Sequence, residues 1–191
     1  MDPLRMYIVV RRGAFDSIDE GGRLAGIAAV KALETFAGDP DLEAWRPRPG
    51  KVVLRARSPS QWEQALEEPH ASAGDGVIAL PPRRRSARST ILTKLQAMRT
   101  ELEPPPPDAP GAPLLYALDP DITMSSGKTL AQIAHAAVMA AALGLDITRA
   151  RTISQPNGAP CVAEVRDSGL TEIPPGTITV KVLVPDRGAG I

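Results

Sequence analysis

The segment from Pro104 to Pro113 is the feature that most restricts how this chain can fold. Six of its ten residues are proline. Because proline fixes φ and removes a backbone donor, neither a helix nor a central strand can run through it. The segment is expected to be stiff, extended and polyproline-like. It therefore predicts a linker over residues 104–113, between halves covering residues 1–103 and 114–191.

The first half alternates strand and helix patterns. A short β-branched run at Tyr7–Val10 predicts a buried strand, and the periodic apolar residues of 22–36 predict a helix. Further strands are expected at Lys51–Arg57 and Val77–Leu80, with a helix between them, and an amphipathic helix is expected at Ile91–Leu102. This order of elements is typical of α/β folds.

The second half begins again with an expected strand, Leu114–Leu118. A helix is expected from Gly127 to Leu143, followed by two strands at Cys161–Val165 and Thr177–Val184. Cys161 is the only cysteine, which excludes a disulfide within the chain and favours a reducing compartment. Because it sits in an apolar run, its side chain is expected to be buried.

Two segments of similar sequence each follow a strand and begin a helix. They are GGRLAGIAA at Gly21–Ala29 and GKTLAQIAH at Gly127–His135, and five positions are identical. Chance matching between alanine-rich helices is one explanation, and an ancient duplication is the other. The duplication predicts that two related α/β halves pack together as an internal pseudo-dimer.

The formal net charge is zero, so charge alone gives no argument for a nucleic-acid partner. One local segment, between Pro81 and Thr100, carries only basic charges. No signal peptide is apparent, and no stretch is long and apolar enough to span a bilayer. We therefore expect a cytoplasmic protein with no membrane partner.

Three polar residues of the second expected helix, Lys128, Gln132 and His135, are spaced i, i+4, i+7 and so share one face. Lys128 lies in the first turn, where free backbone N–H groups already favour an anion. A cation is otherwise disfavoured at that end of a helix, which hints at function. A solvated lysine and a packed histidine remain the alternatives.

A second polar cluster follows the expected strand that begins at Cys161. Asp167 ends this strand, and Gly169 and Gly176 permit backbone conformations that other residues resist. Such a turn, with an aspartate and a threonine at its mouth, can hold a substrate. The alternative is an aspartate that caps its own loop.

These two clusters resemble the motifs of a known family, the type 2 peptidyl-tRNA hydrolases. Residues 124–137, MSSGKTLAQIAHAA, resemble the signature of the family's first helix. Residues 165–180, VRDSGLTEIPPGTITV, resemble its closing hairpin. The two motifs occur in the family's order, and each follows an expected strand.

The resemblance implies a small mixed β-sheet flanked by helices. It also implies cleavage of the ester that joins a peptide's carboxyl carbon to the 3′-ribose of tRNA, with no metal or organic cofactor. Lys128, Asp167 and Thr171 match the family's lysine, aspartate and threonine, and are the expected catalytic residues. Gln132 and His135 match positions that line the same site.

The chain also departs from the family pattern. A family unit has another strand and helix between its first helix and its hairpin, whereas only Leu145–Pro160 lies there in this chain. We therefore expect the second half to lack that middle part and to be a truncated catalytic half. The first half would be a degenerate copy packed against it, in a monomer or a homodimer.

Three functions are compatible with these motifs. The first is hydrolysis of peptidyl- or aminoacyl-tRNA, and the second is transfer of the same acyl group to an amine acceptor, which forms an amide. The third is a non-catalytic module that binds tRNA or another protein. In each tRNA-dependent case, the basic segment is expected to contact the tRNA backbone through the residues Arg83, Arg84, Arg85 and Arg88.

Overall fold

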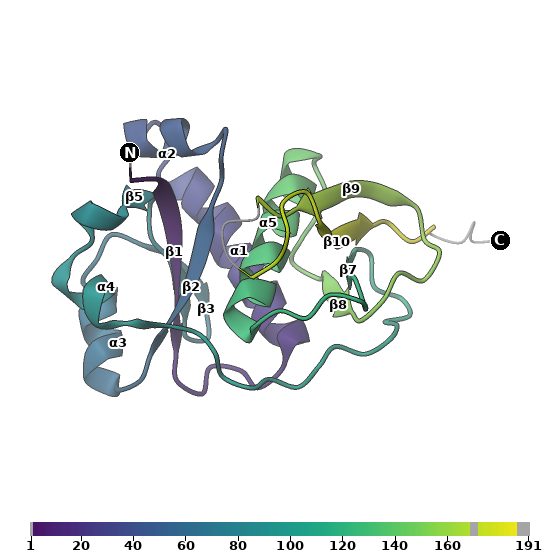
Figure 1. Cartoon of the computed structure of the whole chain (residues 1–191), viewed down its shortest axis with the longest axis horizontal. Coiled ribbons are helices and arrows are strands. Elements are labelled where there is room, and N and C mark those ends of the chain that lie inside the picture. Colours follow the sequence, from purple (N-terminus) through teal and green to yellow (C-terminus); the bar gives the residue numbers. More distant parts are fainter. Residues whose placement is uncertain (1, 169–171, 187–191) are drawn as a thin grey trace.

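Two β-sheets enclose a central pair of helices in this computed structural model, which describes residues 2–168 and 172–186 (Figure 1). The pair consists of α1 (Ile18–Thr35) and α5 (Ser126–Ala142). The expected α/β class with mixed sheets and flanking helices is confirmed. Two of the smaller helices, α3 (Pro59–Leu66) and α4 (Thr90–Lys94), cover the outer face of the first sheet.

The first sheet is built only from residues of the first half. Its strand order is β3-β4-β1-β2-β6, and β1 and β2 are parallel while the other pairs are antiparallel. A two-residue strand, β5, pairs with the start of β1. The bounds are β1 (Leu4–Arg11), β2 (Lys51–Ala56), β3 (Ala71–Gly74), β4 (Val77–Ala79), β5 (Arg83–Arg84) and β6 (Gln96–Ala97).

The central strand β1 is buried on both faces, as its β-branched run predicts. Met6, Ile8 and Val10 belong to the core around α1 and α5. Tyr7 and Val9 belong to a second core beneath α3 and α4. Alternation along a strand sends neighbouring side chains to opposite faces, so the two cores lie on the two sides of the first sheet.

The prediction of a helix over Ile91–Leu102 is wrong beyond the first turn, because α4 ends at Lys94. After α4, the backbone of Gln96 and Ala97 pairs with β2 as an edge strand. Leu95 and Met98 are buried against different cores. Tertiary pairing at the free edge of β2 thus overrides the local helical pattern.

The second sheet repeats the topology of the first. Its order is β8-β7-β10-β9, and β7 and β8 are parallel while the other pairs are antiparallel. The stretch β2-β1-β4-β3 of the first sheet has the same order and the same strand directions. The bounds are β7 (Leu115–Leu118), β8 (Arg151–Ile153), β9 (Cys161–Arg166) and β10 (Ile178–Leu183).

The expectation that Leu145–Pro160 lacks the family's middle strand is wrong. This segment contains β8, in which Thr152 and Ile153 are buried. Asp19 of α1 accepts hydrogen bonds from the Thr152 backbone N–H at 2.8 Å and from the Arg151 side chain. Only the helix is missing from this described stretch.

The two central helices pack closely, because glycines of α1 leave room for side chains of α5. A Cβ built on Gly22 would lie 2.9 Å from Ile133 Cγ2, and one built on Gly26 would lie 2.7 Å from Ala137 Cβ. The second contact lies four residues after the first on both helices, so α1 and α5 run in the same general direction. A single core therefore spans both halves.

The two helices do not begin at the same point of the matched segments. Gly21 is the fourth residue of α1, whereas Gly127 is the second residue of α5. A serine caps the N-terminus of each helix. Ser17 accepts a hydrogen bond from the Glu20 N–H, and Ser125 accepts one from the Lys128 N–H. The shared strand order supports a duplication, and the pseudo-two-fold rotation between the halves stays a prediction.

The remaining segments lie at the surface. Residues 104–113 run along the second half, where Ser154 N–H donates to the Pro106 carbonyl at 2.8 Å and Ala109 is buried. Cys161 is exposed on β9, so the expected burial is wrong, because β9 is an edge strand. No helix in the described ranges is long and apolar enough to cross a membrane. The short helices α2 (Pro40–Trp45) and η1 (Arg85–Ala87) complete the fold.

Candidate functional site

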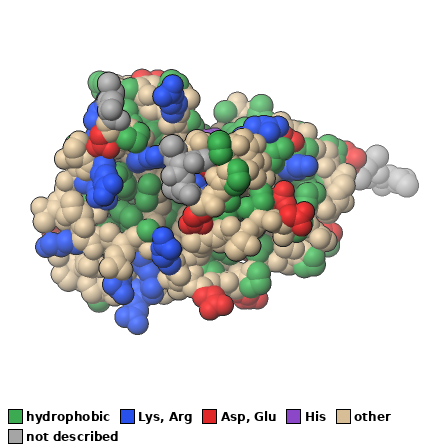
Figure 2. All heavy atoms as spheres, in the orientation of Figure 1, with side chains coloured by type: hydrophobic (Ala, Val, Ile, Leu, Met, Phe, Trp, Pro, Cys, Tyr) green, Lys and Arg blue, Asp and Glu red, His purple; other side chains and the backbone are tan. Residues whose placement is uncertain are grey.

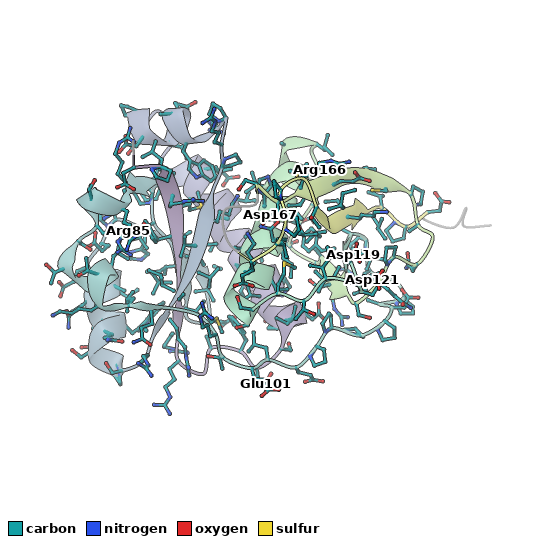
Figure 3. The ribbon with its side chains drawn as sticks, viewed as in Figure 1. Arg85, Glu101, Asp119, Asp121, Arg166 and Asp167 are labelled. Carbon is teal, nitrogen blue, oxygen red and sulfur yellow. The ribbon has the colours of Figure 1, made fainter. Side chains whose placement is uncertain are left out.

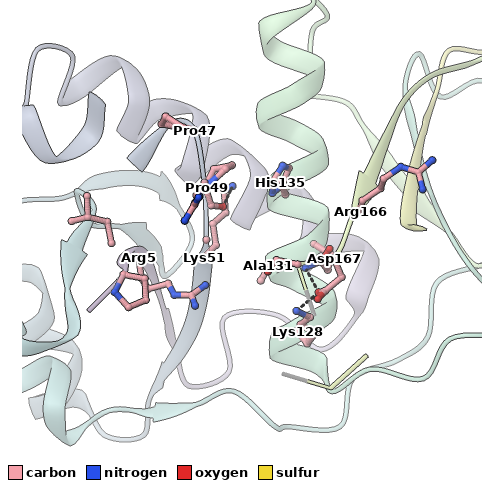
Figure 4. A pocket seen from close by; sticks show the side chains of 15 residues that line it. Arg5, Pro47, Pro49, Lys51, Lys128, Ala131, His135, Arg166 and Asp167 are labelled. Carbon is pink, nitrogen blue, oxygen red and sulfur yellow. Dashed lines mark hydrogen bonds and ion pairs between the residues drawn. The ribbon is translucent and has the colours of Figure 1, made fainter. Parts of the chain in front are cut away.

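A groove runs between the two halves. One cavity of about 400 Å³ is walled by the starts of β1 and β2, the turn at 47–50, the outer side of α5 and the start of the hairpin turn after β9 (Figure 4). A neighbouring cavity of about 480 Å³ extends past the N-terminus of α5 and β6. Both cavities share the residues Arg5, Lys51, Lys128, Ala131 and Ser168, so they form one groove.

Lys128 and Asp167 form an ion pair in the wall of this groove (Figure 4). The structure thus brings together two of the three residues that the resemblance marks as catalytic. The Lys128 side chain is 16% exposed and the Asp167 side chain 1% exposed. The carboxylate therefore lies below the amine, and a ligand in the groove meets the amine first.

A hydrogen-bonded chain holds the Asp167 carboxylate from its other side. Gln132, one turn after Lys128, donates from Nε2 to Asp167 Oδ2 at 3.2 Å. The fully buried Thr179 donates from Oγ1 to Gln132 Oε1 at 2.7 Å. The stripe expected on this helix thus places Lys128 and Gln132 on the same carboxylate. Thr179 is a partner that the sequence analysis missed.

The backbone of the hairpin positions Asp167. Its N–H donates to the Thr177 carbonyl at 2.9 Å, and its carbonyl accepts from the Gly176 N–H at 2.8 Å. Gly176 has φ 81°, a conformation that favours glycine. The hairpin also contacts α5 through Glu172, which accepts hydrogen bonds from Ser125 N–H and Oγ at 2.8 and 2.6 Å. Thr171, the third expected catalytic residue, lies outside the described residues.

His135 lines the same groove two turns along α5 from Lys128. Burial and the nearby charge of Lys51 lower the pKa of His135 to about 3. The imidazole is therefore neutral at pH 7. It can exchange hydrogen bonds with a ligand, but it cannot supply a positive charge to one.

Two cations of the first half, Arg5 and Lys51, also face the groove. Lys51 lies over the Trp45 ring, 4.9 Å from its centroid, and donates to the Pro49 carbonyl at 3.4 Å. Burial lowers the pKa of Lys51 to about 7. Sequence reasoning missed both residues, because Arg5 precedes the strand expected at Tyr7–Val10 and Lys51 reads as the polar start of its strand.

The groove is more basic than the chain as a whole. Its described lining contains two acidic residues, Asp167 and Glu172, and six cations. The cations are Arg5, Arg48, Lys51, Arg99, Lys128 and Arg166. On the face shown in Figure 2, Lys and Arg side chains gather over the first half. A local positive potential thus exists in a chain of zero net charge.

The basic residues expected to contact tRNA lie elsewhere. Arg83 pairs with Glu68 at 3.1 Å, Arg84 donates to the Asp2 carbonyl, and Arg88 lies 5.9 Å from the Tyr7 ring centroid. None of these three lines the groove. Arg85 is exposed, and the ribbons of β1 and β2 run between it and Asp167 (Figure 3). Of the basic segment, only Arg99 reaches the groove.

Comparison with known proteins adds no relative, because no family model, no curated protein and no solved structure matches this chain. Among the residues that the structure describes, no group of three or more His, Cys, Asp or Glu side chains could hold a metal ion.

Proposed function

We propose that the groove binds the 3′ end of a peptidyl- or aminoacyl-tRNA and hydrolyses its acyl ester. The observation that carries this proposal is the Lys128–Asp167 ion pair in the groove wall. Both residues belong to the two segments that resemble the type 2 peptidyl-tRNA hydrolases. An amine at the surface with a carboxylate beneath it combines a charge stabiliser and a proton acceptor in one place.

In this reaction, Asp167 orients a water molecule and accepts one of its protons as the oxygen attacks the acyl carbon. Lys128 stabilises the negative charge on the tetrahedral oxyanion, helped by the N-terminal end of α5. The C–O ester bond then breaks, and the proton passes to the departing 3′-oxygen of the ribose. The products are a carboxylic acid and a tRNA with a free 3′-hydroxyl.

Gln132 and His135 have supporting roles. Gln132 holds the Asp167 carboxylate through its amide and is itself held by Thr179. The neutral His135 is placed to hydrogen-bond the ribose or the acyl group in the cavity beside the 47–50 turn. Thr171 would hydrogen-bond the substrate or the water.

Aminolysis is a second candidate, and the shape of the groove favours it. The groove continues on both sides of Lys128 as two joined cavities, so there is room for an acceptor beside the ester. The amine nitrogen would attack the same acyl carbon, lose a proton to Asp167 and form an amide. The leaving group would again be the ribose 3′-oxygen.

The test is incubation of the full chain with tRNA charged with a radiolabelled amino acid, with and without a panel of amines. Release of free amino acid supports hydrolysis, and an amide that forms only with an amine supports aminolysis. Asp167→Asn should slow formation of either product by about 10²-fold or more, whereas Lys94→Met, an exposed control outside the groove, should not. Unchanged ester in every condition would refute catalysis and leave a non-catalytic tRNA- or protein-binding module.

A further inference from the structure

Arg5 and Lys51 are cations with no carboxylate partner among the residues that the structure describes. Both are partly buried in the groove wall, and neither forms an ion pair within residues 2–168 and 172–186. Burying a charge without a counter-charge is costly, and such charges are normally paired. In contrast, Lys128 across the groove has Asp167 as its counter-charge. The first half therefore presents uncompensated positive charge to the site.

The turn at 47–50 and Trp45 border both side chains. The Arg5 guanidinium lies against Gly50, where any Cβ would collide with it. Trp45 lies beneath the Lys51 amine and donates from Nε1 to the Gly50 carbonyl at 2.8 Å, which fixes the turn. Arg5 extends from β1 toward α5 (Figure 4). Two neighbouring cations that face the same groove are suited to bind an anion.

We propose that Arg5 and Lys51 form a subsite for a phosphodiester, which the first half contributes to the groove. The identity of the ligand as the end of a tRNA rests on the proposed function. The other groove cations favour a phosphodiester over a single carboxylate. Arg99 lies in one cavity, and Arg48 and Arg166 lie in the other, so positive charge recurs along the groove as in sites for polyanions.

Binding should change the protonation of Lys51. In the free protein, burial lowers the pKa of Lys51 to about 7, and a phosphodiester beside the amine would raise this pKa again. The complex should therefore take up a proton when it forms at pH 8. The charged or titratable groups that line this cavity around Lys51 are Arg5 on β1, Arg48 in the turn, Lys128 and His135 on α5, and Arg166 and Asp167 at the hairpin.

The test compares two ligands that differ only in one charge. Cytidylyl-adenosine has a single phosphodiester and ends like a tRNA, and its methylphosphonate analogue is neutral and of similar shape. We expect the full-length protein to bind the charged ligand about ten-fold more tightly, as charge-assisted hydrogen bonds imply. Arg5→Gln and Lys51→Met should bring the two affinities within about two-fold of each other. The matched controls Arg85→Gln and Lys94→Met, outside the groove, should retain the difference.

Proton uptake gives a second measurement that does not depend on truncating a side chain. Calorimetry at pH 8 in buffers of different ionisation heat should show uptake by the wild type. Lys51→Arg should keep the preference for the charged ligand but lose the uptake, because arginine stays protonated. Equal affinity of the wild type for both ligands would overturn the subsite. Neither ligand contains an acyl ester, so this result is independent of whether the charged-tRNA assay shows activity.

Discussion

Gly26 of α1 lies directly against Ala137 of α5, and a Cβ built on Gly26 would stand 2.7 Å from the Ala137 Cβ. This contact lies in the core that the two halves share. The groove residues Lys128, Gln132 and His135 project from the opposite face of α5, so the packing of α5 on α1 holds the helix that carries them. A small change at Gly26 is therefore expected to affect both stability and the site.

Gly26→Ala should destabilise the protein by about 1–3 kcal/mol, because overpacking at this contact outweighs the higher helix propensity of alanine. Ala137→Gly in the same chain should recover part of this loss by restoring the space. Urea denaturation of the two single variants and the double variant gives the coupling energy. Strictly additive effects would show that the two positions do not press on each other.

The ion pair makes a kinetic prediction if the groove is catalytic. Asp167→Asn removes the proton acceptor but can still accept the Gln132 hydrogen bond, so the fold should survive. The rate of acyl-ester cleavage should fall by about 10²–10⁴-fold. Lys128→Met should lower it by about 10²–10³-fold. Single-turnover assays with charged tRNA measure both effects, and activity near wild type in either variant would contradict the assigned roles.

The chain from Thr179 through Gln132 to Asp167 predicts a smaller and different effect. Gln132→Leu removes one hydrogen-bond donor from the carboxylate, and Thr179→Val removes the donor to Gln132 Oε1. Because these residues act by positioning Asp167, kcat should fall about ten-fold with KM nearly unchanged. A double variant no worse than Gln132→Leu alone would confirm one connected chain. Additive losses would instead indicate separate roles.

Burial of Lys51 predicts that stability depends on pH. Its pKa is about 7 in the folded protein and ordinarily 10.5, so above pH 7 the unfolded chain holds a proton that the folded chain has released. The free energy of unfolding should therefore rise between pH 7 and pH 9.5. Urea denaturation at pH 7 and at pH 9.5 should show this rise in the free energy of unfolding for the wild type and for Lys94→Met. It should be absent from Lys51→Met, and a rise of equal size there would assign the effect to another group.

The sequence predicts the elements of this fold better than their contacts. The strand at Tyr7–Val10 and the stripe of Lys128 and Gln132 depend on local periodicity, which is visible along the chain. Asp167 follows from its place at a strand end and from the family resemblance. Arg5 and Lys51 could not be assigned, because they reach the groove only through packing of one half against the other.

Two wrong predictions, the helix at Ile91–Leu102 and the absence of a strand from Leu145–Pro160, have the same origin. The pattern at Ile91–Leu102 suits a helix, yet the free edge of β2 takes Gln96 and Ala97 into the sheet. The three-residue strand β8 is too short to be recognised by alternation, and its pairing with β7 and its hydrogen bond to Asp19 define it. In both cases a distant partner, and not the local sequence, decides the structure.

The salt dependence of tRNA binding can show where the tRNA phosphates contact the protein, in the groove or at the part of the basic segment outside it. Arg99 lines the groove, whereas Arg85 is exposed away from it, although both belong to the segment between Pro81 and Thr100. Each lost phosphate contact should lower the slope of log affinity against log salt by about one unit. We therefore expect a lower slope for Arg99→Ala and an unchanged slope for Arg85→Ala. The reverse result would place the tRNA backbone on the outer face of the first sheet, because only there would Arg85 be within reach of it.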